Sequence, residues 1–375
     1  MPTRRRRSLI LLLLALPSLA GCGEQARQPP AAPPAGAVIA ASTGVPQTRL
    51  AEEVGALFAD PAAGETRTLL VLRDGATVAE AYAPGFGPKT RQIGWSLSKC
   101  VTAVMIGMLV ADGRLRLDET APVPAWQRPG DPRGAVTVRM LLQMRSGLEH
   151  REGFVPATDT MRQLFLDGRD DMAGFAEAKP LADPPGLVFQ YSTASSIILS
   201  DLAARVLAAR DDPESRRRAV LDYLRSRLLD PAGMAGMVPE FDRRGTMIGG
   251  AMIWGTARDW GRLGEFLRRR GSAGGAQLVP SGWIDFMLAP SPANAAYGGQ
   301  IWLNRAAREQ GEMLFAGKAP RDLFACVGAF GQYLIVSPSQ RLTIVRLGRS
   351  DTRAKQRVLR DHLQRIITLF PKPRG

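Results

Sequence analysis

The chain has 375 residues, 45% of them hydrophobic, and carries a formal net charge of +14. This length supports a large core, in one domain or in two closely packed lobes. Arginine runs such as Arg216–Arg218 and Arg268–Arg270 are not interleaved with aromatic residues, unlike the basic surfaces that bind single-stranded nucleic acid. We therefore interpret them as solvated helix faces and expect no nucleic-acid partner.

The N-terminus has the order of a bacterial export signal. Residues Met1–Arg7 are basic, and Leu9–Leu16 are apolar but too few to span a bilayer. The segment ends in Leu19-Ala20-Gly21-Cys22, which resembles the bacterial lipobox. That resemblance implies a signal peptide over residues 1–21, cleavage before Cys22 and a lipid on its thiol. A plain signal peptide with an incidental cysteine is the alternative.

The composition changes after the signal. Residues 22–48 are rich in Pro, Ala and Gly, so we expect an extended tether between a lipid anchor and a folded body over residues 49–375. Because Gly23, and not an aspartate, follows Cys22, the outer membrane is favoured over the inner one. The sequence thus predicts a membrane-anchored protein of the bacterial cell envelope that faces the periplasm.

Secondary-structure signals divide the body into three parts. Two β-prone runs between Thr68 and Tyr82 flank Asp74-Gly75 and predict a β-hairpin. Two further strands are predicted around Pro338-Ser339, near the C-terminus. Helices are predicted at residues 50–58, 96–111, 137–147, 161–175, 195–209, 219–229, 256–267 and 358–370. This order predicts a sheet built from both chain ends, with a helical insertion between them.

The most reactive candidate is the pair Ser96 and Lys99, in the first turn of a predicted helix. Residues three apart lie on one helix face, so the two side chains point the same way. A lysine with a lowered pKa can take the proton of a serine hydroxyl and make it nucleophilic. A lone Ser-x-x-Lys is common by chance, and an ordinary helix with a solvated lysine explains it equally well.

The sequence has few of the residues that other kinds of active site require. The only histidines are His150, in a charged loop, and His362, in the last predicted helix, where a surface position is expected. A Ser-His-Asp triad would have to use His150. With Cys22 assigned to lipid, too few cysteines and histidines remain for a zinc site. No glycine-rich phosphate loop is present, so we expect neither a metal nor another cofactor.

Several motifs, in a fixed order along the chain, support Ser96 as a nucleophile. They are Trp95-Ser96-Leu97-Ser98-Lys99, Leu109 to Asp118, Leu141 to Leu148, Gln190-Tyr191-Ser192-Thr193, Thr256-Ala257-Arg258-Asp259 and Gly328 to Gln332. Together they resemble the class C β-lactamase-like serine hydrolases, in particular the esterase and 6-aminohexanoate-oligomer hydrolase branch, over about Leu50 to Phe370. The resemblance implies an α/β (α+β) fold of the β-lactamase/transpeptidase type, with an antiparallel sheet flanked by helices and a largely helical lobe.

The resemblance also implies roles for individual residues. Ser96 would form an acyl-enzyme, Lys99 would share in proton transfer, and Tyr191 would be a second base that protonates the leaving group. A nearby lysine ammonium would favour the tyrosine phenolate. The oxyanion hole would combine the amide of Ser96 with a strand amide, expected at Gln332 just after Gly331.

The chain departs from the family pattern at two places. Thr193 replaces the asparagine of the Tyr-x-Asn motif, and a hydroxyl cannot make all the contacts of a carboxamide. Ala329-Phe330-Gly331 provides no cation where β-lactamases have one. This favours an esterase or amidase for a small, less anionic substrate; a catalytically silent envelope lipoprotein with a binding role, or a true β-lactamase or DD-peptidase, are the alternatives.

Further candidates depend on the same resemblance. Trp254, Tyr297 and Trp302 are candidate walls of an apolar acyl pocket, although ordinary core aromatics explain them as well. Cys100 follows Lys99, and Cys326 precedes the strand that the family places beside the nucleophile helix. In an oxidising compartment the two could form a disulfide; two buried thiols are the alternative.

Overall fold

Both ends of the folded chain contribute to one antiparallel sheet. In the computed structural model, which describes residues 30–41, 44–306 and 313–371, its strand order is β1-β3-β2-β12-β11-β10-β9. The strands are β1 (Val38–Ile39), β2 (Glu65–Arg73), β3 (Ala76–Tyr82), β9 (Trp302–Leu303), β10 (Phe324–Gly328), β11 (Gln332–Ser337) and β12 (Leu342–Arg349). The sheet therefore confirms the predicted pairing of early and late strands.

The hairpin of β2 and β3 shows how local sequence sets the register. Asp74 and Gly75 both have positive φ, 54° and 84°, as a two-residue turn between antiparallel strands requires. β2 then pairs with β12 along its length, from Arg73 opposite Leu342 to Glu65 opposite Arg349. This long-range pairing joins the two ends of the chain.

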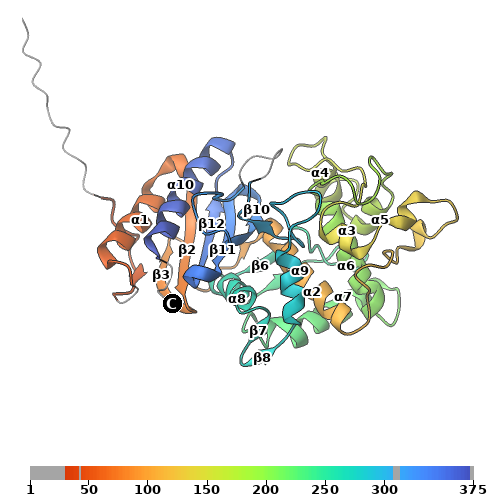
Figure 1. The fold of residues 1–375 in the computed structure, drawn as a ribbon, viewed down its shortest axis with the longest axis horizontal. Coiled ribbons are helices and arrows are strands. Elements are labelled where there is room, and N and C mark those ends of the chain that lie inside the picture. Colours follow the sequence, from red (N-terminus) through yellow and green to blue (C-terminus); the bar gives the residue numbers. More distant parts are fainter. Residues whose placement is uncertain (1–29, 42–43, 307–312, 372–375) are drawn as a thin grey trace, which may run out of the picture. The chain divides into compact units, whose positions relative to one another are not determined.

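Helices cover both faces of this sheet. Helices α1 (Gln47–Ala59) and α10 (Arg353–Leu369) pack together on one face, and α8 (Ala257–Arg268) packs against β2, β11 and β12 on the other (Figure 1). α8 begins with the predicted Thr256 cap, where Thr256 and Asp259 form a reciprocal capping box. His362 is buried on α10 and bonds Asp60, so its predicted surface position was wrong.

The middle of the chain forms the predicted helical insertion (Figure 1). Its helices are α3 (Val138–Leu142), α4 (Asp159–Phe165), α5 (Met172–Glu177), α6 (Thr193–Leu207) and α7 (Pro213–Leu224), and α9 (Ser281–Leu288) follows later. The single helix expected over residues 161–175 is broken after Phe165. Asp171 caps the second piece by accepting a hydrogen bond from the Gly174 amide, which competes with a continuous helix.

Helix α2 (Ser98–Ala111) connects the sheet to the helical insertion. Its residues from Ser98 to Leu109 are all buried, as expected for a helix that is apolar all round. A disulfide joins Cys100 on α2 to Cys326 on β10, with Cα atoms 6.3 Å apart, so the sulfurs are not separate thiols. Small strands β4 (Gln92–Ile93), β5 (Val238–Pro239) and β6 (Ile253–Gly255) form a second sheet, and β7 (Ser272–Ala273) and β8 (Ala276–Gln277) form a short hairpin.

The segment expected to be a tether is partly folded. β1 pairs with β3, Val38 opposite Glu80 and Ile39 opposite Ala79, and the compact unit that contains the sheet begins at Ala31. The signal peptide and Cys22 lie outside the described residues. Within the described ranges, no helix has both the length and the apolar character needed to cross a bilayer.

Candidate active site

The nucleophile candidate lies on a tight turn rather than inside the helix. Trp95–Leu97 form a 3-10 turn that leads into α2, and Ser96 is half-buried there. Trp95 has a φ of 49°, in the left-handed region that non-glycine residues rarely adopt. Such local strain clusters at functional sites, where surrounding packing holds it in place.

Lys99 is buried and makes three hydrogen bonds. Its Nζ is 3.1 Å from Ser96 Oγ, 3.1 Å from Thr193 Oγ1 and 2.6 Å from the carbonyl oxygen of Gly250. Burial disfavours the charged amine and lowers the pKa of Lys99 to about 8, although the carboxylate of Glu152 acts in the opposite direction. A usable fraction of Lys99 is therefore neutral near neutral pH.

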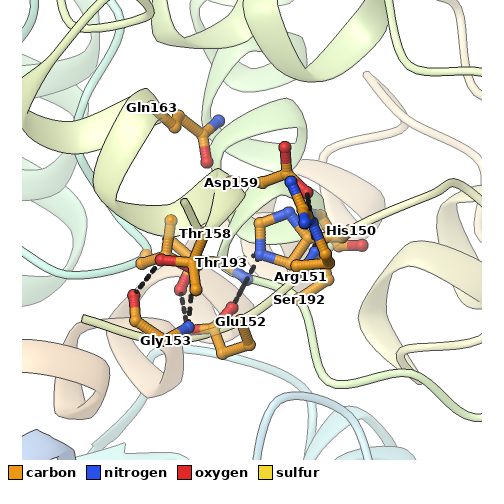
Figure 2. Close-up of polar contacts among 12 residues, drawn as sticks. His150, Arg151, Glu152, Gly153, Thr158, Asp159, Gln163, Ser192 and Thr193 are labelled. Atoms are coloured by element: carbon orange, nitrogen blue, oxygen red, sulfur yellow. Dashed lines mark hydrogen bonds and ion pairs between the residues drawn. The ribbon is translucent and has the colours of Figure 1, made fainter. Parts of the chain in front are cut away.

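Glu152 fixes the direction of the hydrogen bonds around Lys99. Thr193 donates its hydroxyl proton to Glu152 Oε1 over 2.7 Å, because a carboxylate only accepts, and its amide donates to Glu152 Oε2 over 2.8 Å (Figure 2). Thr193 can then only accept from Lys99, and the Gly250 carbonyl also only accepts. Of the three partners, only Ser96 can donate back. When Lys99 loses a proton, its lone pair therefore faces the serine hydroxyl.

His150 does not take part as a triad histidine. Its Nε2 donates to Glu152 Oε2 over 2.8 Å, and among the described residues it makes no hydrogen bond to Ser96 (Figure 2). In Glu152, desolvation alone would raise the pKa of the carboxyl. The hydrogen bond from His150 and the charge of Lys99 outweigh this and hold the pKa at about 2. Glu152 is thus ionised at any physiological pH.

Sequence reasoning gave no role to Glu152 or to Gly250. Glu152 was one of four polar residues in a row, and periodicity does not say which of them faces inward. Gly250 follows Gly249, where a Cβ would collide with the side chains of Thr102 and Ser200. This glycine pair was the available sign that the backbone at Gly250 packs closely against other groups, because glycine has no side chain to prevent such contact.

Tyr191 lies beside Ser96 but in a different state from the one expected. It hydrogen-bonds Ser96, and its ring centroid is 5.1 Å from Lys99 Nζ. Loss of solvent and the nearby charge of Glu152 raise its pKa well above the ordinary value, and the bond to Ser96 only partly offsets them. The expected stabilisation of a phenolate by Lys99 is therefore wrong, and the raised pKa keeps Tyr191 protonated.

A cavity of about 930 Å³ opens onto Ser96. Of the three aromatic walls predicted for it, Trp302 lines the cavity and stacks on Tyr191, with ring centroids 5.7 Å apart. Tyr297 is buried behind them, 4.9 Å from the Trp302 ring. Trp254 does not line it, because its indole nitrogen bonds Glu240. Phe154 and Phe189, which were not predicted, contribute further apolar surface.

Strand β10 forms the side of the cavity nearest Ser96. Gly328 packs so closely against the turn of Ser96 that a Cβ would collide with the carbonyl oxygen of Gly94. Gly328 and Gly331 line the cavity, whereas Gln332 does not. The Gln332 side chain is buried in bonds to Ala329 and Gly348, and its backbone lies opposite Gly328 in the β10–β11 ladder. Gly328 and Gly331 thus border the cavity beside Ser96, and the oxyanion role of the Gln332 amide stays a prediction.

In the described ranges, no group of three or more His, Cys, Asp and Glu side chains is arranged to hold a metal ion. The groups around Ser96 are instead those of a serine–lysine site, with a nucleophile, a lysine of lowered pKa and a protonated tyrosine.

The sequence matches the profile of the Beta-lactamase family over residues 62–369. The chain belongs to the β-lactamase family. Its serine–lysine site lies within the matched residues, and the predicted serine hydrolase fold is confirmed. The catalytic roles of individual residues stay predictions.

One named relative of the chain is a hydrolase. The chain is 27% identical over 241 residues to the 6-aminohexanoate-dimer hydrolase of Paenarthrobacter ureafaciens, an alignment that covers 60% of this chain and 57% of that enzyme. The chain thus matches less than two thirds of the relative's length.

Solved structures share the fold. A Bacillus anthracis protein provisionally named a 6-aminohexanoate-dimer hydrolase has a TM-score of 0.65 at 21% identity, covering 82% of this chain and 81% of that one. A family VIII carboxylesterase has a TM-score of 0.61 at 16% identity, covering 85% and 97%. At these identities, the likeness shows a common architecture.

Proposed function

We propose that this protein is a serine hydrolase that cleaves an ester or amide bond of a small molecule through an acyl-enzyme on Ser96. The observation that carries the proposal is the contact of buried Lys99 with the Ser96 hydroxyl at 3.1 Å, in a setting where only Ser96 can donate to a neutral Lys99. The family match and the 6-aminohexanoate-dimer hydrolase relative support hydrolysis of such bonds.

In the proposed acylation step, neutral Lys99 takes the hydroxyl proton while Ser96 Oγ bonds to the substrate carbonyl carbon. The carbonyl oxygen becomes an oxyanion, which the amide of Ser96 and a backbone amide of the segment from Gly328 to Gln332 would stabilise. Tyr191 gives its proton to the leaving oxygen or nitrogen as the scissile bond breaks. The new Lys99 ammonium then returns a proton to Tyr191.

In the second step, water hydrolyses the acyl-enzyme. Lys99, neutral again, takes a proton from the water, and the hydroxide adds to the acyl carbon. Collapse of this intermediate breaks the bond to Ser96 Oγ, which regains a proton from Lys99. The cycle needs no metal and no organic cofactor.

The proposal is tested with a fluorophosphonate probe, p-nitrophenyl butyrate and nitrocefin, on the soluble body and on Ser96→Ala. We expect Ser96-dependent labelling and ester turnover, and a loss of at least about 10³-fold in the variant. Absence of both would favour a silent, ligand-binding lipoprotein. Rapid nitrocefin hydrolysis would favour a true β-lactamase, the third possibility.

We also propose that the enzyme is anchored in the bacterial cell envelope through a lipid on Cys22. The basic and apolar N-terminal segments before this residue support an exported lipoprotein. In cells supplied with labelled palmitate, the wild-type chain should take up the label and Cys22→Ala should not. An unlabelled wild-type chain, or equal labelling of both, would contradict the anchor.

A further inference from the structure

The cavity has a second charged feature that the proposed chemistry does not use. Four side chains of α10 line it: Arg353, Gln356, Arg357 and Arg360. The three arginines are four and three residues apart, which places them on one face of the helix. We call this group the α10 wall.

Within the ranges that the structure describes, the three arginines of the α10 wall have no carboxylate partner at ion-pair distance. By contrast, Arg365 on the same helix pairs with Glu53 at 3.0 Å. Arg360 bonds the Tyr333 hydroxyl, and Arg353 and Arg357 are exposed at the cavity. Their guanidinium donors are thus available to a ligand.

The carboxylate of Glu152, which lines the cavity, already has partners other than the α10 arginines. Its two oxygens accept hydrogen bonds from His150 and Thr193. The other walls are largely apolar, with Phe154, Phe189 and Trp302. The cavity is therefore cationic along α10 and apolar along its aromatic sides.

Resting on the serine hydrolase function above, we propose that the substrate carries a carboxylate that binds the α10 wall. Its scissile carbonyl reaches Ser96, and an apolar segment lies against the aromatic rings. Arginine suits this role because its planar fork bonds both oxygens of a carboxylate. Arginines of α10 thus supply the cation that is missing at Ala329-Phe330-Gly331. The proposed substrate is therefore anionic, contrary to the expectation from the sequence.

The test uses esters that differ only in charge. For the acyl side, the pair is p-nitrophenyl hexanoate and mono-p-nitrophenyl adipate, which ends in a carboxylate; p-nitrophenyl 6-aminohexanoate adds a terminal ammonium. For the leaving-group side, the pair is 4-carbamoylphenyl hexanoate and 4-carboxyphenyl hexanoate. The quantity compared is the ratio of kcat/KM for the anionic ester to that for its neutral partner.

We expect at least one anionic ester to exceed its neutral partner by about tenfold or more at low salt, with the ammonium ester the poorest substrate. Added salt should reduce the preference, because exposed charges are screened. Arg357→Ala should lower the ratio by about tenfold, Arg357→Lys by less, and Arg365→Ala should leave it unchanged.

Two failures can be told apart. Ser96-dependent hydrolysis of the esters with ratios near one, or ratios insensitive to Arg357, would overturn the carboxylate site and leave the hydrolase function standing. No Ser96-dependent hydrolysis of any ester would instead remove the function on which the inference rests.

Discussion

Two walls of the same cavity handle charge in opposite ways. The catalytic wall, made of Ser96, Lys99, Glu152 and Tyr191, has its hydrogen bonds made within the protein, so each side chain is held in a fixed orientation. The α10 wall leaves exposed guanidinium groups without a carboxylate partner among the described residues. Chemistry needs groups that are pre-organised before substrate arrives, whereas recognition needs donors that the substrate itself completes.

Removing Lys99 should have the largest effect on the catalytic wall. We expect Lys99→Ala to lower kcat by about 10³-fold, because the serine loses its general base, with little change in KM. Circular dichroism would verify the fold, and Lys89→Ala, at an exposed position, is the matched control. A variant with wild-type turnover would remove Lys99 from the mechanism.

Tyr191→Phe should have the next largest effect, and its size should depend on the leaving group. We expect a loss of about 10²-fold for an alkyl ester or amide, whose leaving group needs a proton. For a p-nitrophenyl ester the loss should be much smaller, because p-nitrophenolate leaves without one. Equal losses for both substrates would contradict the role of Tyr191 as the acid.

Glu152→Gln should shift the pH dependence rather than abolish activity. The carboxylate raises the pKa of Lys99 above the value that burial alone would set, so its removal should lower that pKa further below about 8. The rate of a lysine base rises as pH passes through its pKa, so the acid limb of kcat/KM should move to lower pH. The exposed Glu149→Gln should not move it. An unmoved limb in Glu152→Gln would mean that Glu152 does not set the pKa.

The smallest effect on activity is expected at the disulfide, which joins the catalytic helix α2 to β10. Replacing both Cys100 and Cys326 by alanine should lower the free energy of unfolding by about 2–4 kcal/mol, as for long loops closed by a disulfide. Denaturant unfolding with and without reductant measures this. The ratio of anionic to neutral ester turnover should not change, since α10 is not part of this link. A variant as stable as the wild type would mean that the disulfide does not stabilise the fold.

Local sequence determined much of the framework. The Asp74-Gly75 turn, the Thr256 cap and the apolar helix after Ser96 each follow from residues close in the chain, whose backbone preferences need no partner. The order of strands and helices then predicted a sheet from both ends. Ser96, Lys99 and Tyr191 were recognisable because their motifs occur in a known order.

Tertiary structure decided what surrounds those residues. That Glu152 faces Lys99 while neighbouring Glu149 faces solvent depends on how a loop folds back over α6, and no short-range pattern encodes it. The raised pKa of Tyr191 follows from desolvation and from the charge of Glu152, 39 positions away in sequence. The arginines of α10 line a cavity only because the helix packs beside it, and their spacing in the sequence does not show this. Electrostatic surroundings depend on distances in space, which sequence spacing alone does not provide.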